Sequence, residues 1–377
     1  MAVADFLVIG GGIAGLSAAA RLAGHGHVVL LEGEAALGYH ASGRSATFSH
    51  FGIGDATVRA LTRHSQSFFA APPEGFAPVP LARAAAALFV AREEMLPALG
   101  LLHERMAPLS DGVARVSEAE MLALCPLLRT GADGVVAAIV DRNGQRLDAD
   151  ALLQAYARRI RAHGGETLTG RRVAAVRRLG PDWEVAAESG ERWTAPILVN
   201  AAGAWADQVA RLAGVAPLGL APKRRTIIVF DPPPATDVRG WPFVKSVVDE
   251  FYMLPEAGRL MASPADEIDD APGDAQPEDY DIALAAHQVE RYTVMPVPRI
   301  AHRWAGLRTF APDRVPVAGF APDAPGFFWL AGQGGFGLQT APAMAEIAEA
   351  LIVGGAWPAG LASLGVEAAQ ITPERLR

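Results

Sequence analysis

A glycine-rich stretch near the amino terminus restricts the fold of this chain more than any other feature. The segment FLVIGGGIAGLSAAARLAG, residues 6–24, predicts a buried strand, a turn and a helix, and HVVLLE, residues 27–32, predicts a second buried strand. Such an order with short connections forms a parallel βαβ unit. The glycines match G-x-G-x-x-G at Gly10, Gly12 and Gly15. In this pattern they allow a tight turn, a close backbone approach to a pyrophosphate, and close packing of helix on strand.

An acidic residue, Glu32, ends the second predicted strand. A carboxylate at that place can accept hydrogen bonds from a ribose hydroxyl. The unit therefore predicts a site for an ADP-containing nucleotide, with Ile13 and Ala14 at the helix start and Gly33 beside the acid. The motif alone does not separate FAD from NAD.

Composition excludes several other classes of protein. The formal charge of -8 and the pI near 5.6 argue against nucleic-acid binding, because such binders concentrate basic charge on one face. The single cysteine, Cys125, allows no intrachain disulfide and no cysteine metal cluster, and its apolar surroundings predict a buried thiol. We expect no metal site. The first apolar run is interrupted by glycines, so it predicts neither a signal peptide nor a membrane span. The expected location is cytoplasmic, with peripheral attachment to a membrane left open.

Further elements are predicted along the chain. Residues 148–166 form a helix that an aspartate caps and two glycines end. Strands are expected within 172–179, 182–188 and 197–205, and a last buried strand begins at 326. Residues 72–146 show only weak helical patches. Residues 265–281, ADEIDDAPGDAQPEDYD, read as a solvated surface excursion, with a lid as the alternative.

Three segments favour FAD over NAD. GYHASGRSA, residues 38–46, follows the acid closely and offers a small, polar and basic loop for the diphosphate and the flavin edge. RVAAVRRL, residues 172–179, and LVNAAGAWADQVA, residues 198–210, can flank the adenine and the pyrophosphate. Each segment alone is equally well explained as sheet core or turn.

Together these segments resemble the FAD-dependent amino-acid oxidoreductases of the D-amino-acid oxidase, glycine oxidase and sarcosine oxidase type. The resemblance covers nearly the whole chain and is closest to bacterial D-amino-acid dehydrogenases of the D-arginine dehydrogenase kind. It is carried by DFLVIGGGIAG, GYHASGRSA, LVNAAGAW, PLGLAPKRR, FYMLPEAG, WAGLRTF and GFFWLAGQGGFGLQT. It implies non-covalently bound FAD, because Cys125 does not occupy the late position where sarcosine oxidases attach their flavin.

The resemblance also implies the architecture. We expect an α/β fold with a Rossmann-like FAD-binding domain and an inserted, mixed-sheet α+β substrate domain. The FAD-binding domain is predicted to combine residues 1–80, 145–215 and 318–377, and the substrate domain to combine 81–144 and 216–317. The cofactor-binding residues implied outside the first turn are Gly43, Arg44, Ser45, Ala46, Val173, Ala201, Gly203, Trp205, Gly335, Gly337, Leu338, Gln339 and Thr340.

A second glycine-rich turn, LAGQGGFGLQTAPAMAEIAEALI at residues 330–352, also leads into a helix. In the family it lies beside the flavin ring, and the helix beginning near Gln339 and Thr340 directs its positive end towards the N1–C2=O region. A helix N-terminus stabilises the negative charge that reduction places there. A simple helix-start loop would explain neither the number of glycines nor their position after a buried strand.

The substrate side is inferred from an amino acid's own groups. A carboxylate in an apolar pocket is bound well by a guanidinium with two parallel hydrogen bonds. Family position suggests Arg308 first and Arg225 second, with Tyr252 at the same end of the substrate. His50 is the nearest candidate to steer the amine proton, although an ordinary loop histidine is an equal alternative. Gln339 completes the predicted catalytic group.

The reaction implied is oxidative deamination of a D-amino acid. Hydride passes from Cα to flavin N5, and the imino acid is hydrolysed to a 2-oxo acid and ammonia. The chain has alanines at 85–87 where the D-arginine dehydrogenase type has an acid, so neutral or apolar side chains are expected over D-arginine.

Other functions stay open at this point. The alternatives are a glycine- or sarcosine-type secondary-amine oxidase, a 2-hydroxy-acid dehydrogenase, and a flavin-binding subunit of a heteromeric complex. The electron acceptor is a quinone, another carrier or O2, and a dehydrogenase is favoured by resemblance.

Overall fold

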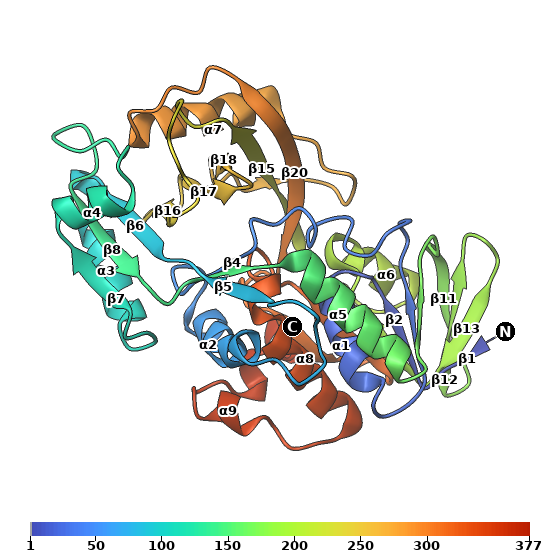
Figure 1. Ribbon diagram of the computed structural model, residues 1–377. Coiled ribbons are helices and arrows are strands. Elements are labelled where there is room, and N and C mark those ends of the chain that lie inside the picture. Colours follow the sequence, from blue (N-terminus) through green and yellow to red (C-terminus); the bar gives the residue numbers. More distant parts are fainter. Residues whose placement is uncertain (1) are drawn as a thin grey trace.

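The computed structural model describes residues 2–377, which form two large sheets and two small ones (Figure 1). The first large sheet has six strands, in the order β10 (Glu166–Leu168), β3 (Val28–Leu31), β2 (Phe6–Ile9), β14 (Ile197–Asn200), β22 (Phe327–Ala331) and β21 (Val317–Phe320). Every neighbouring pair is parallel except β21 and β22. The predicted strand–helix–strand unit is confirmed as β2, α1 (Ile13–Leu22) and β3.

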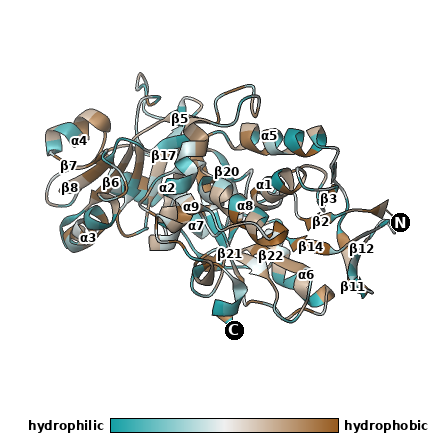
Figure 2. Cartoon of the chain, turned by 90° about the horizontal axis from the view of Figure 1, so that it is seen from below, coloured by the Kyte–Doolittle hydropathy of each residue, from teal (hydrophilic) through white to brown (hydrophobic). Residues whose placement is uncertain are grey.

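Both faces of this sheet are covered. Val8 of β2 packs towards the helices α1, α2 (Ala56–Ala70), α5 (Ala149–Ala162) and α8 (Gly337–Val353). Leu7 and Ile9 point to the other face, where they meet the small four-stranded sheet described below and α6 (Ala206–Leu212). Side chains alternate across a strand, so strands buried on both faces are uniformly apolar. Figure 2 shows this hydropathy along the chain from below.

The two small sheets border the large one. One has four strands, in the order β1 (Ala2–Val3), β13 (Arg192–Ala195), β12 (Asp182–Ala187) and β11 (Val173–Leu179). The other joins β4 (Phe48–Ser49), β9 (Gln145–Leu147) and β5 (Ala82–Ala84). The helix predicted at 148–166 is α5, and the Asp148 carboxylate caps it by accepting a hydrogen bond from the Ala151 N–H at 2.9 Å.

The second large sheet has nine strands. Its order is β19 (Ile268–Asp269), β15 (Ala221–Phe230), β18 (Arg259–Ser263), β17 (Tyr252–Glu256), β16 (Phe243–Ser246), β6 (Ala87–Ala91), β8 (Ala137–Asp141) and β7 (Val113–Val116), with β20 (Ile300–Phe310) also paired to β15. Helices α3 (Leu96–Met106), α4 (Glu118–Leu124) and α7 (Asp279–Tyr292) pack around it, and α9 (Ala359–Ala362) lies near the carboxyl terminus.

The expectation of weak helical patches across residues 72–146 was wrong for much of that range. It contains β5, β6, β7 and β8 besides α3 and α4. In β6, Leu88 packs on one face and Phe89 on the other, so the strand reads as an unbroken apolar run. Such a run cannot be told from a buried helix by periodicity.

The strands fall into the two large sheets in the mixed α/β arrangement that was expected. The six-stranded sheet takes its strands from residues 6–31, 166–200 and 317–331, and the nine-stranded sheet from 87–141 and 221–310. The precise domain boundaries stay a prediction. Cys125 is fully buried, and burial raises the pKa of its thiol to about 12. Among residues 2–377, no helix combines the length and the apolarity needed to cross a membrane.

Candidate active site

A cavity of about 450 Å³ lies where the six-stranded sheet meets β15 and β20. Its wall includes most of the residues that the sequence predicted for a cofactor: Gly10, Gly12, Ile13, Ala14, Glu32, Gly33, Arg44, Ser45, Ala46, Val173, Ala201, Gly203, Trp205, Gly335, Gly337 and Leu338. The candidate substrate residues Arg225 and Arg308 also line it. Segments more than three hundred residues apart in the chain therefore share one wall.

Two glycines of the first turn, Gly10 and Gly15, have no room for a side chain. Gly10 has a φ of +111°, and a Cβ on it would lie 2.3 Å from the Ala201 carbonyl oxygen. A Cβ on Gly15 would lie 1.9 Å from the Gly10 oxygen. Gly15 is not among the described residues that line the cavity. Because it has no side chain, α1 can pack closely against β2.

The Glu32 carboxylate organises the same end of the cavity. Its Oε2 accepts a hydrogen bond from the Gly11 N–H at 2.6 Å, and its Oε1 accepts one from the Glu34 N–H at 2.8 Å. Each carboxylate oxygen has further lone pairs, so the group can still receive hydroxyl donors from a ligand. Ser42 closes the turn, since its Oγ accepts a hydrogen bond from the Ile13 N–H at 3.0 Å.

The second glycine turn supplies the opposite end. Helix α8 begins at Gly337, two residues before the predicted start. The first N–H groups of a helix have no partner inside the helix, and the helix dipole adds positive charge there. Gly335, Gly337 and Leu338 place this end of α8 in the cavity wall.

Besides Gly15, three predicted cofactor residues lie outside the wall, as far as the described chain shows. Gly43 packs against Gly38, where a Cβ would meet the Gly38 oxygen at 2.6 Å. Thr340 is buried, and its hydroxyl donates to the Phe336 carbonyl at 2.9 Å. Gln339 turns towards α2, where its Nε2 donates to Thr62 Oγ1 at 2.7 Å. These residues shape the site from behind, so the geometry gives no support to direct contact by Gln339.

Arg308 projects from β20 into the cavity. Among the described residues no hydrogen bond or ion pair occupies its guanidinium. Burial and the neighbouring Arg225 charge lower the pKa of Arg308 to about 10, so it stays cationic at neutral pH. A half-buried guanidinium without an acid is ready to receive an anion.

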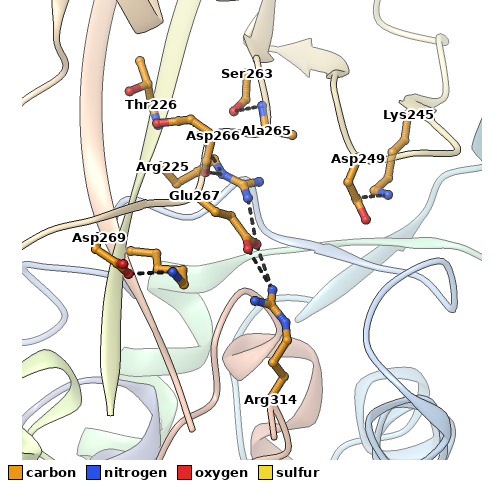
Figure 3. Close-up of polar contacts among 11 residues, drawn as sticks. Arg225, Thr226, Lys245, Asp249, Ser263, Ala265, Asp266, Glu267, Asp269 and Arg314 are labelled. Atoms are coloured by element: carbon orange, nitrogen blue, oxygen red, sulfur yellow. Dashed lines mark hydrogen bonds and ion pairs between the residues drawn. The ribbon is translucent and has the colours of Figure 1, made fainter. Parts of the chain in front are cut away.

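Arg225 has the opposite character. Its Nε donates to the Asp266 carbonyl oxygen at 2.6 Å, and its Nη2 lies 3.3 Å from Glu267 Oε1. Arg314 holds the same carboxylate at 2.9 Å (Figure 3). Arg225 therefore lines the cavity as an already neutralised group and is the weaker anion site.

Tyr252 of β17 and His50, which lies beside Phe89 and Phe243, are both buried and are not among the described residues that line the cavity. The Tyr252 hydroxyl is buried and has no hydrogen-bond partner among the described residues. Such a group is uncommon in a native structure and is expected to find a ligand or water. The Arg225 guanidinium carbon lies 5.9 Å from the centre of the Tyr252 ring.

His50 is a neutral ring. Burial, followed by the charges of Lys245 and Arg308, lowers its pKa to about 3 despite an opposing effect of Asp249. Its Nδ1 accepts the Gly52 N–H at 3.0 Å, which leaves the ring proton on Nε2. A ring with this pKa is a poor base for an ammonium ion, so the predicted proton-steering role has little support.

Some cavity residues were missed from the sequence. His40 and Arg172 line the cavity, and both hold Glu34, at 3.0 Å and 2.7 Å. The His40 ring lies 4.7 Å from the Trp205 ring. The only signal in the sequence was their position within GYHASGRSA and RVAAVRRL.

Residues 265–281, which we call the acidic segment, are held against the basic run KRR rather than free in solvent. Lys223 pairs with Asp269 at 2.6 Å, and Arg224 pairs with Glu278 at 2.6 Å. Further along, Arg44 forms an ion pair with Asp274. Gly273 and Ala275 of the segment line the cavity, so it covers part of the site. The expected surface excursion is therefore an ion-paired cover.

Comparison with known proteins agrees with this geometry. A family model described as "DAO: FAD dependent oxidoreductase" matches residues 5–351. The chain belongs to this family. The glycine cradle, Glu32 and the α8 end fit the FAD of this family in chemical type.

Curated relatives are distant. An uncharacterized oxidoreductase, YurR, of Bacillus subtilis (strain 168) is 25% identical over 253 residues, covering 65% of this chain and 64% of its own. The FAD-dependent oxidoreductase domain-containing protein 1 of Bos taurus is 27% identical over 178 residues, covering 42% of this chain and 36% of its own. The chain thus spans less than two thirds of either relative.

Solved structures share the fold. L-proline dehydrogenase from P. horikoshii has a TM-score of 0.84 at 21% identity, covering 99% of this chain and 98% of its own. Glycine oxidase from Geobacillus kaustophilus has 0.82 at 19%, covering 95% and 96%. L-amino acid deaminase from Proteus vulgaris has 0.80 at 16%, covering 100% and 97%. At these identities the likeness shows the fold alone.

Proposed function

We propose that this enzyme oxidises the Cα–N bond of a D-α-amino acid and passes the electrons to a carrier other than O2. The observation that carries the proposal is Arg308, a cavity guanidinium with no acidic partner among the described residues. An α-carboxylate would complete it with two parallel hydrogen bonds. The D configuration and the dehydrogenase activity rest on the resemblance of the sequence motifs to D-arginine dehydrogenases.

The roles of the chain's residues follow from their chemistry. Bound FAD supplies the acceptor for the hydride that leaves Cα. Arg308 holds the carboxylate, and the unpartnered Tyr252 hydroxyl donates to the same end of the substrate. His50 is neutral and does not remove the amine proton. The substrate is therefore productive with its amine already neutral, and the protein contributes orientation and exclusion of water.

Cationic side chains are disfavoured in this proposal. Three cations lie near Tyr252: Arg225 beside its ring, Lys245 paired with it across the sheet, and Arg308, whose charge interacts with it. The alanine run itself lies elsewhere, since Ala85 and Ala86 line a separate cavity of about 110 Å³ that also includes Arg83. We therefore expect D-arginine to be a poor substrate because these cations repel its guanidinium, and not because an acid is missing at the alanine run.

A secondary amine is the second candidate substrate. The named activities of the structural relatives include a proline dehydrogenase and a glycine oxidase, and a secondary amino acid offers the same carboxylate to Arg308. A 2-hydroxy acid would do so too, but lacks the amine. A flavin-binding subunit of a heteromeric complex would be inactive alone.

An anaerobic flavin spectrum tests the proposal. D- and L-amino acids, proline, sarcosine and lactate are added one at a time to purified protein. Loss of the oxidised flavin band with D-amino acids supports the proposal, and loss only with proline, sarcosine or lactate replaces the substrate class. No loss with any compound, despite bound FAD, would favour a missing partner. Hydrogen peroxide formed in air in step with turnover would contradict the dehydrogenase part.

A further inference from the structure

Lys245 is a buried charged residue on the nine-stranded sheet. The chain has only two lysines, Lys223 and Lys245. Lys245 lies in β16 and is 4% exposed. Its Cα pairs with Tyr252 on β17 and with Phe89 on β6, so the three residues form one row across the sheet. Residues paired in this way project from the same face of a sheet.

The Lys245 ammonium has one acidic partner among the described residues, Asp249 (Figure 3). An ammonium carries three hydrogen-bond donors. The two partners differ in exposure: the Lys245 side chain is 5% exposed, whereas the Asp249 side chain is 68% exposed. Asp249 also sits in the β16–β17 turn with a φ of 58°. The carboxylate can therefore return to water while the ammonium stays buried.

The other cations near Lys245 each have an anionic partner in the structure or in the proposed function. Arg225 has Asp266 and Glu267 as partners, and Arg308 is reserved for an α-carboxylate in the proposed function. Lys245 and Arg308 both act on the buried ring of His50. Lys245 is thus the remaining buried cation of this group whose counter-ion faces solvent. A buried ammonium is stable only with an anionic or hydrogen-bonding partner.

We propose that Lys245 binds a second carboxylate, carried on the side chain of the substrate, so that the preferred substrates are acidic α-amino acids. This inference rests on the proposed function, because it takes Arg308 and Tyr252 as the site of the α-carboxylate. The side-chain carboxylate replaces Asp249 at the ammonium, and Asp249 becomes solvated. No covalent step is involved.

Glutamate is a suitable probe of this inference. Lys245 and Tyr252 are paired on neighbouring strands, whose backbones are about 4.8 Å apart. Four C–C bonds of ~1.5 Å in an extended chain separate the two carboxylate carbons of a five-carbon diacid by about 5 Å. We therefore choose a five-carbon diacid to carry the second carboxylate.

The surroundings of the row are apolar. Phe243, two residues before Lys245, stacks on Phe48 with ring centres 4.8 Å apart and on His50 at 5.0 Å. Within the row of Phe89, Lys245 and Tyr252, Lys245 is the charged residue, and Asp249 is its counter-ion. The same cation opposes the guanidinium of D-arginine, in agreement with the preference already proposed.

Two substitutions of opposite expected effect test the inference. We would measure kcat/KM for D-glutamate and for its uncharged isostere D-glutamine in wild type, Lys245→Met and Asp249→Asn. The inference predicts a glutamate-to-glutamine ratio above one in wild type. Lys245→Met should lower that ratio by roughly 10- to 100-fold, because a charge-assisted hydrogen bond contributes about 1.5–3 kcal/mol. Asp249→Asn should raise it, because the competing carboxylate is lost. Lys223→Met, which changes the other lysine, should leave it unchanged.

A second readout does not depend on turnover. Protein labelled with ¹⁵N and ¹³C in lysine alone contains two labelled side chains, and Lys223→Met assigns them. Glutarate, a five-carbon diacid without an amine, should shift the Lys245 signal, whereas butyrate should not. Wild-type preference for D-glutamine, an unchanged ratio in a flavin-loaded Lys245→Met protein, or an unmoved Lys245 signal would overturn the inference. If other D-amino acids still reduce the flavin, the proposed function survives; if no amino acid does, the proposed function fails as well.

Discussion

Gly335 lies directly against Arg308. A Cβ on Gly335 would be 2.7 Å from Arg308 Nη1 and 3.0 Å from its Cζ. The late glycine turn therefore does more than bring a helix end to the cavity, because its missing side chain fixes where the guanidinium can lie. The glycine turn at the predicted cofactor site and the arginine at the proposed substrate site are therefore in direct contact.

Adding a methyl group at Gly335 should displace the guanidinium. We expect Gly335→Ala to raise KM for an amino acid roughly tenfold or more, since a charged hydrogen bond contributes about 1.5–3 kcal/mol. Gly355→Ala is a suitable control, because its Cβ would have only ordinary contacts of 3.7 Å or more. Steady-state kinetics of the two flavin-loaded variants distinguish them, and an unchanged KM in Gly335→Ala would contradict the role given to the contact.

Loss of the Glu32 carboxylate should weaken FAD binding. Glu32→Ala leaves the N–H groups of Gly11 and Glu34 without their acceptor and removes an acceptor for the ligand. We expect a rise in the FAD dissociation constant of roughly 10- to 100-fold. Flavin fluorescence during titration of the apoprotein measures it. Glu74→Ala, an exposed acid, is the control; equal affinities of the two variants would show that Glu32 does not serve the cofactor.

The acidic segment should slow the release of FAD through its pair with Arg44. Asp274→Asn removes that ion pair beside the cavity, whereas Asp269→Asn removes the pair with Lys223. Partly exposed pairs contribute about 0.2–1 kcal/mol, so we expect Asp274→Asn to speed FAD release roughly two- to fivefold and Asp269→Asn to change it little. Added salt should speed release in wild type more than in Asp274→Asn. The rate of FAD release can be measured by stopped flow in the presence of excess competitor flavin. Equal release rates from Asp274→Asn and Asp269→Asn would refute the prediction.

The buried ring of His50 should make stability depend on pH. Its pKa of about 3 in the folded protein lies below the ordinary value near 6.5, so only the unfolded chain takes up the proton between these values. Unfolding free energy should therefore fall as pH decreases from 6.5 towards 3, by at most about 1.4 kcal/mol per pH unit from this group. In His50→Asn the amide oxygen can still accept the Gly52 N–H, and the pH profile should be flatter. Denaturant unfolding at several pH values gives the comparison, and parallel profiles would count against it.

The sequence predicted the nucleotide unit well because local rules decide it. Gly10, Gly15 and Glu32 are fixed by a turn, a helix–strand contact and a strand end, and these are visible within thirty residues. The same holds for α5, whose cap at Asp148 is a local signal.

The remainder depends on contacts between distant segments. The strands β6 and β8 were missed because both of their faces are buried. Gln339 was expected at the cofactor, but its amide donates to Thr62 of α2, a contact that only the folded chain creates. The difference between Arg225 and Arg308 arises from Asp266 and Glu267, residues that only the folded chain brings to Arg225.

The central claim is that Arg308 receives the carboxylate of an amino-acid substrate. The most direct test compares anaerobic flavin reduction by D-leucine and by 3-methylbutylamine, its counterpart without the carboxylate, in wild type, Arg308→Met and Arg303→Met. Arg303 lies on the same strand and is exposed. We predict that wild type and Arg303→Met prefer D-leucine strongly. Arg308→Met should lose that preference by roughly 10- to 100-fold while keeping its FAD. An Arg308→Met protein that still favours D-leucine to the wild-type degree would contradict the account.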